Sequence, residues 1–195
     1  MIIENGVGDA TKAKVNGRNE LTVFSVTESE SQHAASIGDA YNINTGEETF
    51  AASTSSGLLY FKNDETEDII IEAIALGFKN STTTDDLLSI YVVRNPTGGT
   101  LFDAATAVDM NQNRNLGSSQ TLKTTTLAYK STAQNQTLTG GDDIILLHCS
   151  KAGRTFATIN LEIPRGAAIG LRVDSASLAT TCYAALVLHV KDGVR

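Results

Sequence analysis

Three histidines and two cysteines are the residues of this sequence best suited to hold a transition metal. His148 and Cys149 are adjacent, and His189 and Cys182 lie in a later apolar run. Consecutive residues of a β-strand point to opposite faces, so His148 and Cys149 are poorly placed to share one ion. We therefore expect no metal site and no cofactor, and we interpret the histidines, His33 among them, as structural or surface residues. Cys149 and Cys182 are expected to be buried, reduced thiols.

Other chemistries leave equally weak signals in the sequence. No Gly-x-Ser-x-Gly elbow is present, which disfavours a hydrolase triad. Gly6 and Gly8 resemble part of a phosphate loop, but the hydrophobic strand and the third glycine of that motif are missing. Acidic pairs such as Asp142-Asp143 leave open a calcium site assembled from several loops. The sequence predicts a non-enzymatic protein.

Charge and hydropathy narrow the possible partners. The formal net charge is −7, and the lysines and arginines are scattered singly, whereas nucleic-acid binding calls for a basic stripe. No apolar run approaches the ~18 residues of a membrane helix, and no signal-peptide pattern is visible. We expect a chain made in a cytosol, without nucleic-acid or membrane partners.

From residue 39 onward, short apolar runs alternate with turn-forming residues such as glycine, asparagine and proline. This pattern, without helical periodicity between the runs, predicts an all-β fold: an antiparallel jelly roll or β-sandwich of about eight strands. In 156–163 and 182–190 the alternation assigns one face to the core. The expected strands are 57–63, 68–78, 87–94, 121–127, 144–149, 156–163, 168–173 and 182–190.

Residues 1–38 lack the regular succession of strand patterns seen in the remainder. We therefore divide the chain into an N-terminal arm or hairpin (1–38) and a jelly-roll domain (39–195). Asn16-Gly17 favours a tight turn, and 28–37 is compatible with one or two helical turns. The longest stretch without a pattern is 103–119, a candidate interaction loop. The arm and this loop supply the candidate partner contacts: Lys12, Lys14, Val15, Leu21, Val23, Phe24, Met110 and Arg114.

The first third of the chain carries a set of distinctive motifs: Gly6-x-Gly8, Lys12-Ala13-Lys14-Val15, Asn19-Glu20-Leu21, 25–30, the Tyr-Asn element at 40–46, and 57–63. Together they resemble a family of tailed-bacteriophage virion structural proteins. The resemblance implies a capsid decoration (cement) protein or another head or tail accessory protein, often trimeric. Our leading hypothesis is a jelly-roll decoration protein that binds the major capsid protein. The resemblance also implies a place in the virion, assembled in the host bacterial cytoplasm, and it supplies no catalytic residues.

Two other functions remain open at this point. The same domain could serve as a tail, baseplate or fibre adaptor, which the sequence does not separate from a head protein. A carbohydrate-binding module is a weaker alternative, since sugar sites use aromatic platforms, and this chain has no Trp and only 6% aromatic residues.

Overall fold

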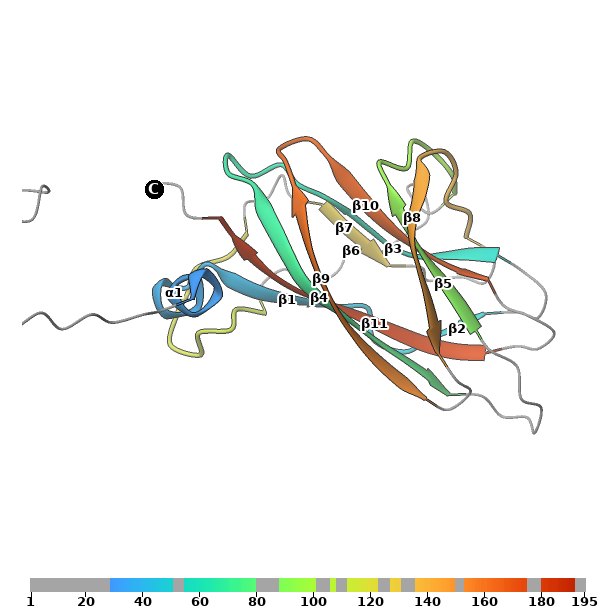
Figure 1. The fold of residues 1–195 in the computed structure, drawn as a ribbon, viewed down its shortest axis with the longest axis horizontal. Helices are drawn as coiled ribbons and strands as arrows, with labels where there is room; N and C mark the ends of the chain where they lie inside the picture. The colour runs from blue at the N-terminus through green and yellow to red at the C-terminus, as the bar shows by residue number, and fades with distance from the viewer. Residues whose placement is uncertain are drawn as a thin grey trace, which may run out of the picture.

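The computed structural model describes residues 29–50, 55–79, 88–100, 106–107, 112–122, 127–130, 136–149, 153–174 and 180–191. This part of the chain is a β-sandwich with one short helix, α1 (Glu30–Ile37), at one end (Figure 1). Its strands are β1 (Ala40–Asn44), β2 (Glu48–Phe50), β3 (Ser55–Lys62), β4 (Ile69–Lys79), β5 (Leu88–Arg94), β6 (Thr106–Ala107), β7 (Leu127–Lys130), β8 (Asp142–Cys149), β9 (Arg154–Ile163), β10 (Ala168–Asp174) and β11 (Thr180–Val190).

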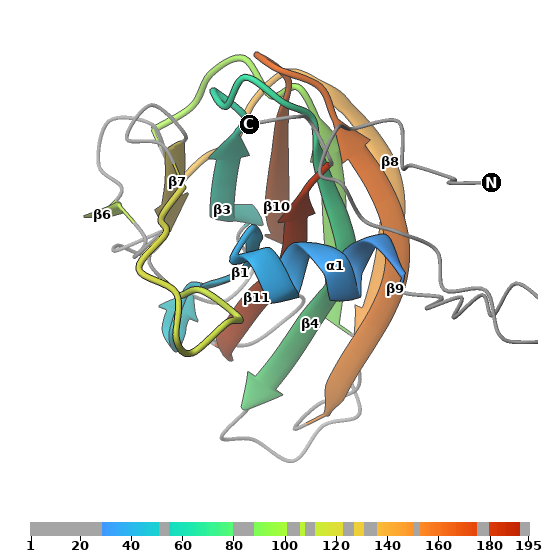
Figure 2. The ribbon, with the colours of Figure 1, turned by 90° about the vertical axis from the view of Figure 1, so that its left-hand side faces the viewer.

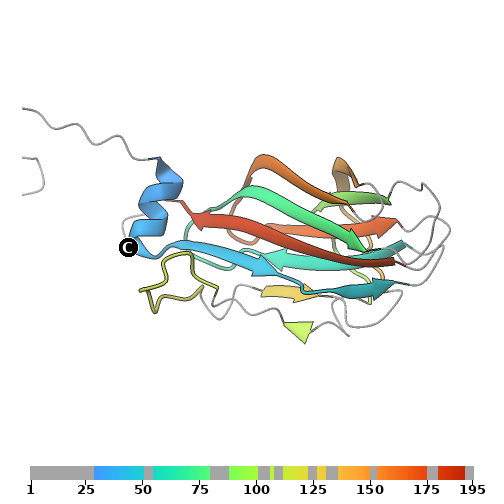
Figure 3. The same cartoon turned by 90° about the horizontal axis from the view of Figure 1, so that it is seen from below.

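The strands form two antiparallel sheets that pack face to face, and Figure 3 looks onto the first sheet, with the second sheet behind it. The first sheet has the order β1-β11-β4-β9, with β2 also paired to β11, and the second has the order β6-β7-β3-β10-β5-β8. The prediction of an antiparallel β-sandwich is therefore confirmed.

The jelly-roll part of the prediction remains an interpretation, which the pairing order favours. When the short β2, β6 and β7 are set aside, eight strands remain. The first pairs with the eighth (β1–β11), the second with the seventh (β3–β10), the third with the sixth (β4–β9) and the fourth with the fifth (β5–β8). Such nested antiparallel pairing is typical of a jelly roll.

The core lies between the sheets and follows the alternation in the sequence. In β11 the side chains of Cys182, Ala184, Leu186, Leu188 and Val190 are all buried, as predicted. In β9 the predicted solvent face is exposed throughout, while the opposite face is partly or fully buried. The two cysteines are free and buried, which confirms their prediction, and burial raises the pKa of the Cys182 thiol.

The strand count and one boundary differ from expectation. The described residues contain eleven strands, and β1, β2 and β6 were not predicted because they are short or polar. A strand expected over 121–127 is wrong at its start, because Thr121 and Leu122 are not in a strand and β7 begins at Leu127.

Candidate functional site

Helix α1 is fixed in place by its caps and by one buried side. Ser29 accepts a hydrogen bond from the backbone of Gln32, and the Gln32 side chain accepts one from the Ser29 backbone, a reciprocal capping box. Gly38 ends the helix with φ +89°, a conformation that glycine adopts without strain. Ala34 is completely buried. The expectation of helical turns over 28–37 is thus confirmed, and the helix lies across the end of the sandwich, from β1 toward β9 (Figure 2).

Below α1, Glu72 of β4 gathers three donors on one carboxylate oxygen. Its Oε1 accepts hydrogen bonds from Ser31 Oγ at 2.6 Å, from His189 Nδ1 at 2.8 Å and from Arg114 Nη1 at 2.9 Å. The register of β4 shifts at this position against both neighbouring strands. A β-bulge of this kind redirects a side chain, and it places a carboxylate where helix, loop and sheet meet.

The pKa of Glu72 reflects two opposed effects. Burial alone would raise the pKa of its carboxyl group, but the hydrogen bonds from Ser31 and His189 and the charge of Arg114 outweigh burial and lower it below its usual range. The carboxylate is thus ionised at neutral pH. Through these contacts the Glu72 carboxylate on β4 holds three other parts of the chain: α1, β11 and the loop that contains Arg114.

His189 is the second buried polar residue of this group, with 4% of its surface exposed. An ionised carboxylate only accepts hydrogen bonds, so His189 carries a proton on Nδ1. Its other nitrogen, Nε2, has no hydrogen-bond partner among the described residues and lies 3.9 Å from Glu30 Oε1 at the start of α1. The imidazole therefore fills the space between the helix and β11.

The loop over 112–122 completes this end and covers the edge of β1. The Asn42 amide donates to Gln112 O at 2.9 Å, and the Arg114 amide donates to Ala40 O at 2.8 Å. The Asn113 side chain donates to Gly38 O at 2.6 Å and to Gln120 O at 3.1 Å, while Asn115 donates to Ser36 O at 3.0 Å. We call α1, this loop, Glu72 and His189 the anchored end.

The anchored end also presents apolar side chains to solvent. Leu116, at the tip of the loop, is fully exposed, and Ile37 on the last turn of α1 is 43% exposed. The Asn113 and Asn115 side chains bond the backbone two residues ahead, a turn geometry that fixes the loop around Leu116. A large apolar side chain held out on such a loop is suited to contact a partner.

Of the candidate partner contacts named from the sequence, only Arg114 lies in the described part of the chain. Lys12, Lys14, Val15, Leu21, Val23, Phe24 and Met110 lie outside the described residues, as does the hairpin expected around Asn16-Gly17. Arg114 is described, and its guanidinium is engaged within the chain by Glu72 and Ser31. Whether it also meets a partner stays a prediction. The helix at the end of the expected arm, by contrast, packs on the sandwich.

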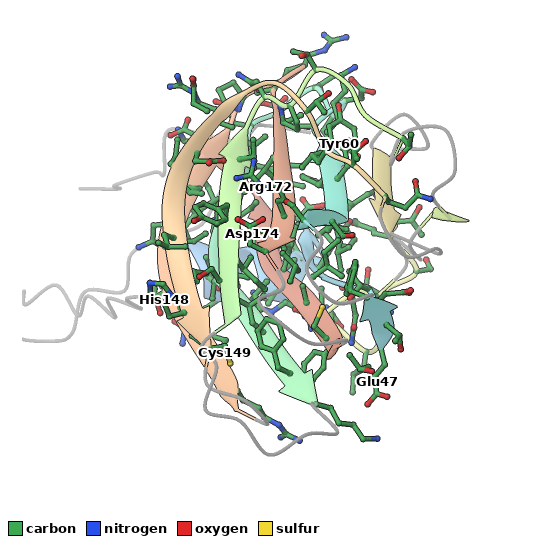
Figure 4. The ribbon with its side chains drawn as sticks, turned by 90° about the vertical axis from the view of Figure 1, so that its right-hand side faces the viewer. Glu47, Tyr60, His148, Cys149, Arg172 and Asp174 are labelled. Atoms are coloured by element: carbon green, nitrogen blue, oxygen red, sulfur yellow. The ribbon has the colours of Figure 1, made fainter. Side chains whose placement is uncertain are left out.

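Sequence reasoning missed Glu72. A signal existed, because Glu72 is the only charged residue between Ile69 and Phe78. His189 was named from the sequence as a structural or surface histidine, and its place against Glu72 under α1 was not predicted. His148 and His189 lie on β8 and β11 in different sheets. Cys149 is buried while His148 is exposed on the same strand (Figure 4), in line with opposite faces.

The remaining polar features do not gather into a reaction centre. Within the described ranges no cluster of three or more His, Cys, Asp or Glu side chains is placed to hold a metal ion. On the outer face of the second sheet, Arg172 stacks on Tyr91 at 4.8 Å and binds Asp143 at 2.9 Å, close to Asp174 (Figure 4). These contacts join β10, β5 and β8 and are those of a stabilised sheet surface.

A pocket of about 240 Å³ lies at the end of the sandwich away from α1, lined by residues that include Lys79, Arg154 and Tyr183. The Tyr183 ring lies over Gly77, where a Cβ atom would collide with it. The pocket is smaller than the ~300–1,000 Å³ usual for small-molecule sites. Among the described residues, no helix has the length and apolar character to cross a membrane.

Comparison with known proteins gives no family. No protein-family model matches the chain, and no curated protein matches it. Solved structures similar to it include the VP2 protein of infectious bursal disease virus in T=1 particles, at 12% identity and a TM-score of 0.21 over 80% of this chain. Another is the VP2 subviral particle of that virus, at 11% identity and a TM-score of 0.18 over 77% of this chain.

The chain spans about 40% of the length of these VP2 chains. TM-scores of this size carry no argument about function. The case for a function must come from the chain's own residues and their arrangement.

Proposed function

We propose that this chain is a virion structural protein, and more narrowly a capsid decoration (cement) protein. In this role it is a non-enzymatic homo-oligomer, a trimer at three-fold positions, that binds the major capsid protein of a tailed bacteriophage and stabilises the head. It resides in the virion and is assembled in the host bacterial cytoplasm. The resemblance of 6–63 to virion proteins and the nested strand pairing support the proposal.

The observation that carries the proposal is the construction of the anchored end. Residues 1–28 attach to the sandwich at Ser29, next to a helix and a loop that are locked to the sheet by Glu72, Asn113 and Asn115. Leu116 projects from the same end. A contact made from a fixed backbone loses little conformational entropy on binding, and several copies bound at once multiply weak contacts. A rigid apolar contact thus lies at the end of the sandwich where the expected arm joins the described chain.

Binding to phage particles tests this function. Purified protein is mixed with heads that lack it and, separately, with isolated tails, and the bound fraction is measured by co-sedimentation. We expect binding to heads, with affinity reduced at least tenfold by Leu116→Ser. The matched control is Leu146→Ser, which removes a partly exposed leucine from β8 on another face and should bind like the wild type.

A chain that starts at Ser29 tests the arm and spares α1, whose contacts with β4 and β11 a cut at residue 38 would remove. It should remain folded and bind heads more weakly. Binding to tails alone would instead assign the protein to a tail, baseplate or fibre. Binding to neither particle would reject a virion role.

A further inference from the structure

Strand β9 is the last strand of its sheet, and its outer edge has no partner among the described residues. It runs from Arg154 to Ile163 and pairs with β4 alone. An unpaired edge presents a row of backbone N–H and C=O groups that another strand can bond. A strand of this length is therefore either protected against pairing or used for it.

The exposed face of β9 carries one large apolar side chain among polar ones. Phe156 is 66% exposed, the highest value of any large hydrophobic side chain in a described strand. On the inward face, Ile159 and Leu161 are only partly buried and pack at the rim of the core. Lysine and proline, which commonly protect edges, are absent between Arg154 and Ile163.

One protective feature is present, and it covers half of the edge. Asn160 has φ +47°, and the register with β4 shifts between Leu161 and Thr158. This bulge bends the second half of the strand. The first half, Arg154 to Thr158, pairs regularly with β4, and Phe156 is at its centre.

We propose that β9 is a contact between two copies of this chain, whose β9 edges lie antiparallel about a two-fold axis. Charge complementarity argues for a second copy as the occupant. Arg154 begins the strand and Glu162 lies near its end, beyond the bulge. An antiparallel copy centred on Thr158, just before the bulge, pairs the strands over a short central stretch and brings each Arg154 toward Glu162 of the other copy, twice. A parallel arrangement would bring like charges together.

The charged groups are available for this contact. Arg154 is exposed and makes no ion pair with any residue that the structure describes, and Glu162 binds Lys191 at 2.8 Å in a partly exposed pair. Exposed ion pairs add little affinity but select orientation. Phe156 and the backbone edge therefore supply the affinity, and the two charges set the direction. A two-fold contact repeats every interaction twice.

The β9 edge is a different surface from the anchored end. The proposed two-fold contact can therefore be confirmed or rejected independently of the proposed function. A trimer held by other surfaces leaves β9 free to join neighbouring trimers at two-fold positions. In that case disruption of β9 reduces the assembly to separate trimers.

The test is the molar mass of the purified chain, measured by light scattering over a range of concentrations. We expect Phe156→Asp to lower the mass to that of the assembly without β9 contacts, which is half the wild-type mass for a simple dimer, with an unchanged circular dichroism spectrum. Leu146→Asp, the control at an exposed leucine of β8, should leave the mass unchanged.

The decisive experiment is a charge swap. Arg154→Glu and Glu162→Arg should each weaken association at least tenfold, and the double variant should restore it. A wild type whose mass equals that of Phe156→Asp would overturn the proposal. So would a double variant that associates no better than the single ones.

Discussion

The two edge strands of the first sheet, β1 and β9, differ in what bonds their outer edges. At β1, the loop over 112–114 bonds the strand edge, and Tyr41 and Ile43 beneath it are completely buried. At β9, no described strand pairs with the outer edge, the Thr155 hydroxyl donates to His148 O of β8 at 3.3 Å, and Ile159 and Leu161 remain partly exposed. Among the described residues, the chain therefore covers one edge of its first sheet with its own backbone and leaves the other edge unpaired.

The covered edge at β1 contributes to the stability of the fold, whereas the open edge at β9 is free to contribute to association. At the closed edge, the same loop that covers β1 also carries Arg114 to Glu72, so the fold of the anchored end depends on it. At the open edge, the exposed side chains add little to the fold of a single copy, because apolar area stabilises only when it is removed from water. Substitutions at the two edges should therefore have different consequences.

The largest effect is expected from a matched pair of isoleucines. Ile43→Ala at the closed edge should lower the free energy of unfolding by about 2–5 kcal/mol, the usual result of truncating a fully buried Ile. Ile159→Ala at the open edge should cost about 1 kcal/mol, because its side chain is only partly buried. Urea denaturation of dilute protein measures both, and equal losses would contradict the comparison.

A matched pair of glutamates gives the next effect. Glu72→Gln should destabilise by about 1–3 kcal/mol, because three donors lose an ionised acceptor. Glu162→Gln, at the exposed Lys191 pair, should change stability little.

The Glu72 effect should depend on pH. Since the folded pKa of Glu72 is lowered, its stabilisation is present above its ordinary pKa of 4.5 and is lost as the pH falls through the folded value. Denaturation curves at several pH values should show wild type and Glu72→Gln converging as the pH is lowered below 4.5. A constant difference across that range would be inconsistent with this role for the carboxylate.

Opening the closed edge is expected to have a smaller effect. Asn113→Ala removes the side-chain bonds to Gly38 O and Gln120 O and should cost about 1 kcal/mol. Hydrogen exchange should speed up at the Asn42 amide, which donates to Gln112 O. Exchange in β4 should hardly change. Unaltered protection at Asn42 would mean that the loop does not hold that edge.

The smallest effect on stability is expected at Leu116. Its side chain is fully exposed, so Leu116→Ser should change the free energy of unfolding by less than about 0.5 kcal/mol. Thermal unfolding measures this directly. A large loss would show that the loop tip packs in the folded chain, and its weakened particle binding would then have another explanation.

The sequence predicted the elements whose pattern is local. The alternation in 156–163 and 182–190 identified the faces of β9 and β11, because neighbouring side chains in a strand must alternate. The short β2 and β6 have too few residues to show any period.

The anchored end could not be predicted in the same way. Ser31, Glu72, Arg114 and His189 are far apart in the chain and meet only because β4, β11 and the loop are brought under α1. The bulge that redirects Glu72 leaves no mark in a binary pattern. The open edge of β9 is likewise a property of sheet order, which alternation within one strand does not encode.

A cryo-EM map of the phage particle that carries this protein tests the central claim most directly. The account predicts sandwich-shaped density repeated over the shell, with the anchored end and Leu116 toward the major capsid protein. Particles whose shell lacks this density, or that carry it only on the tail, would contradict the assignment as a capsid decoration protein.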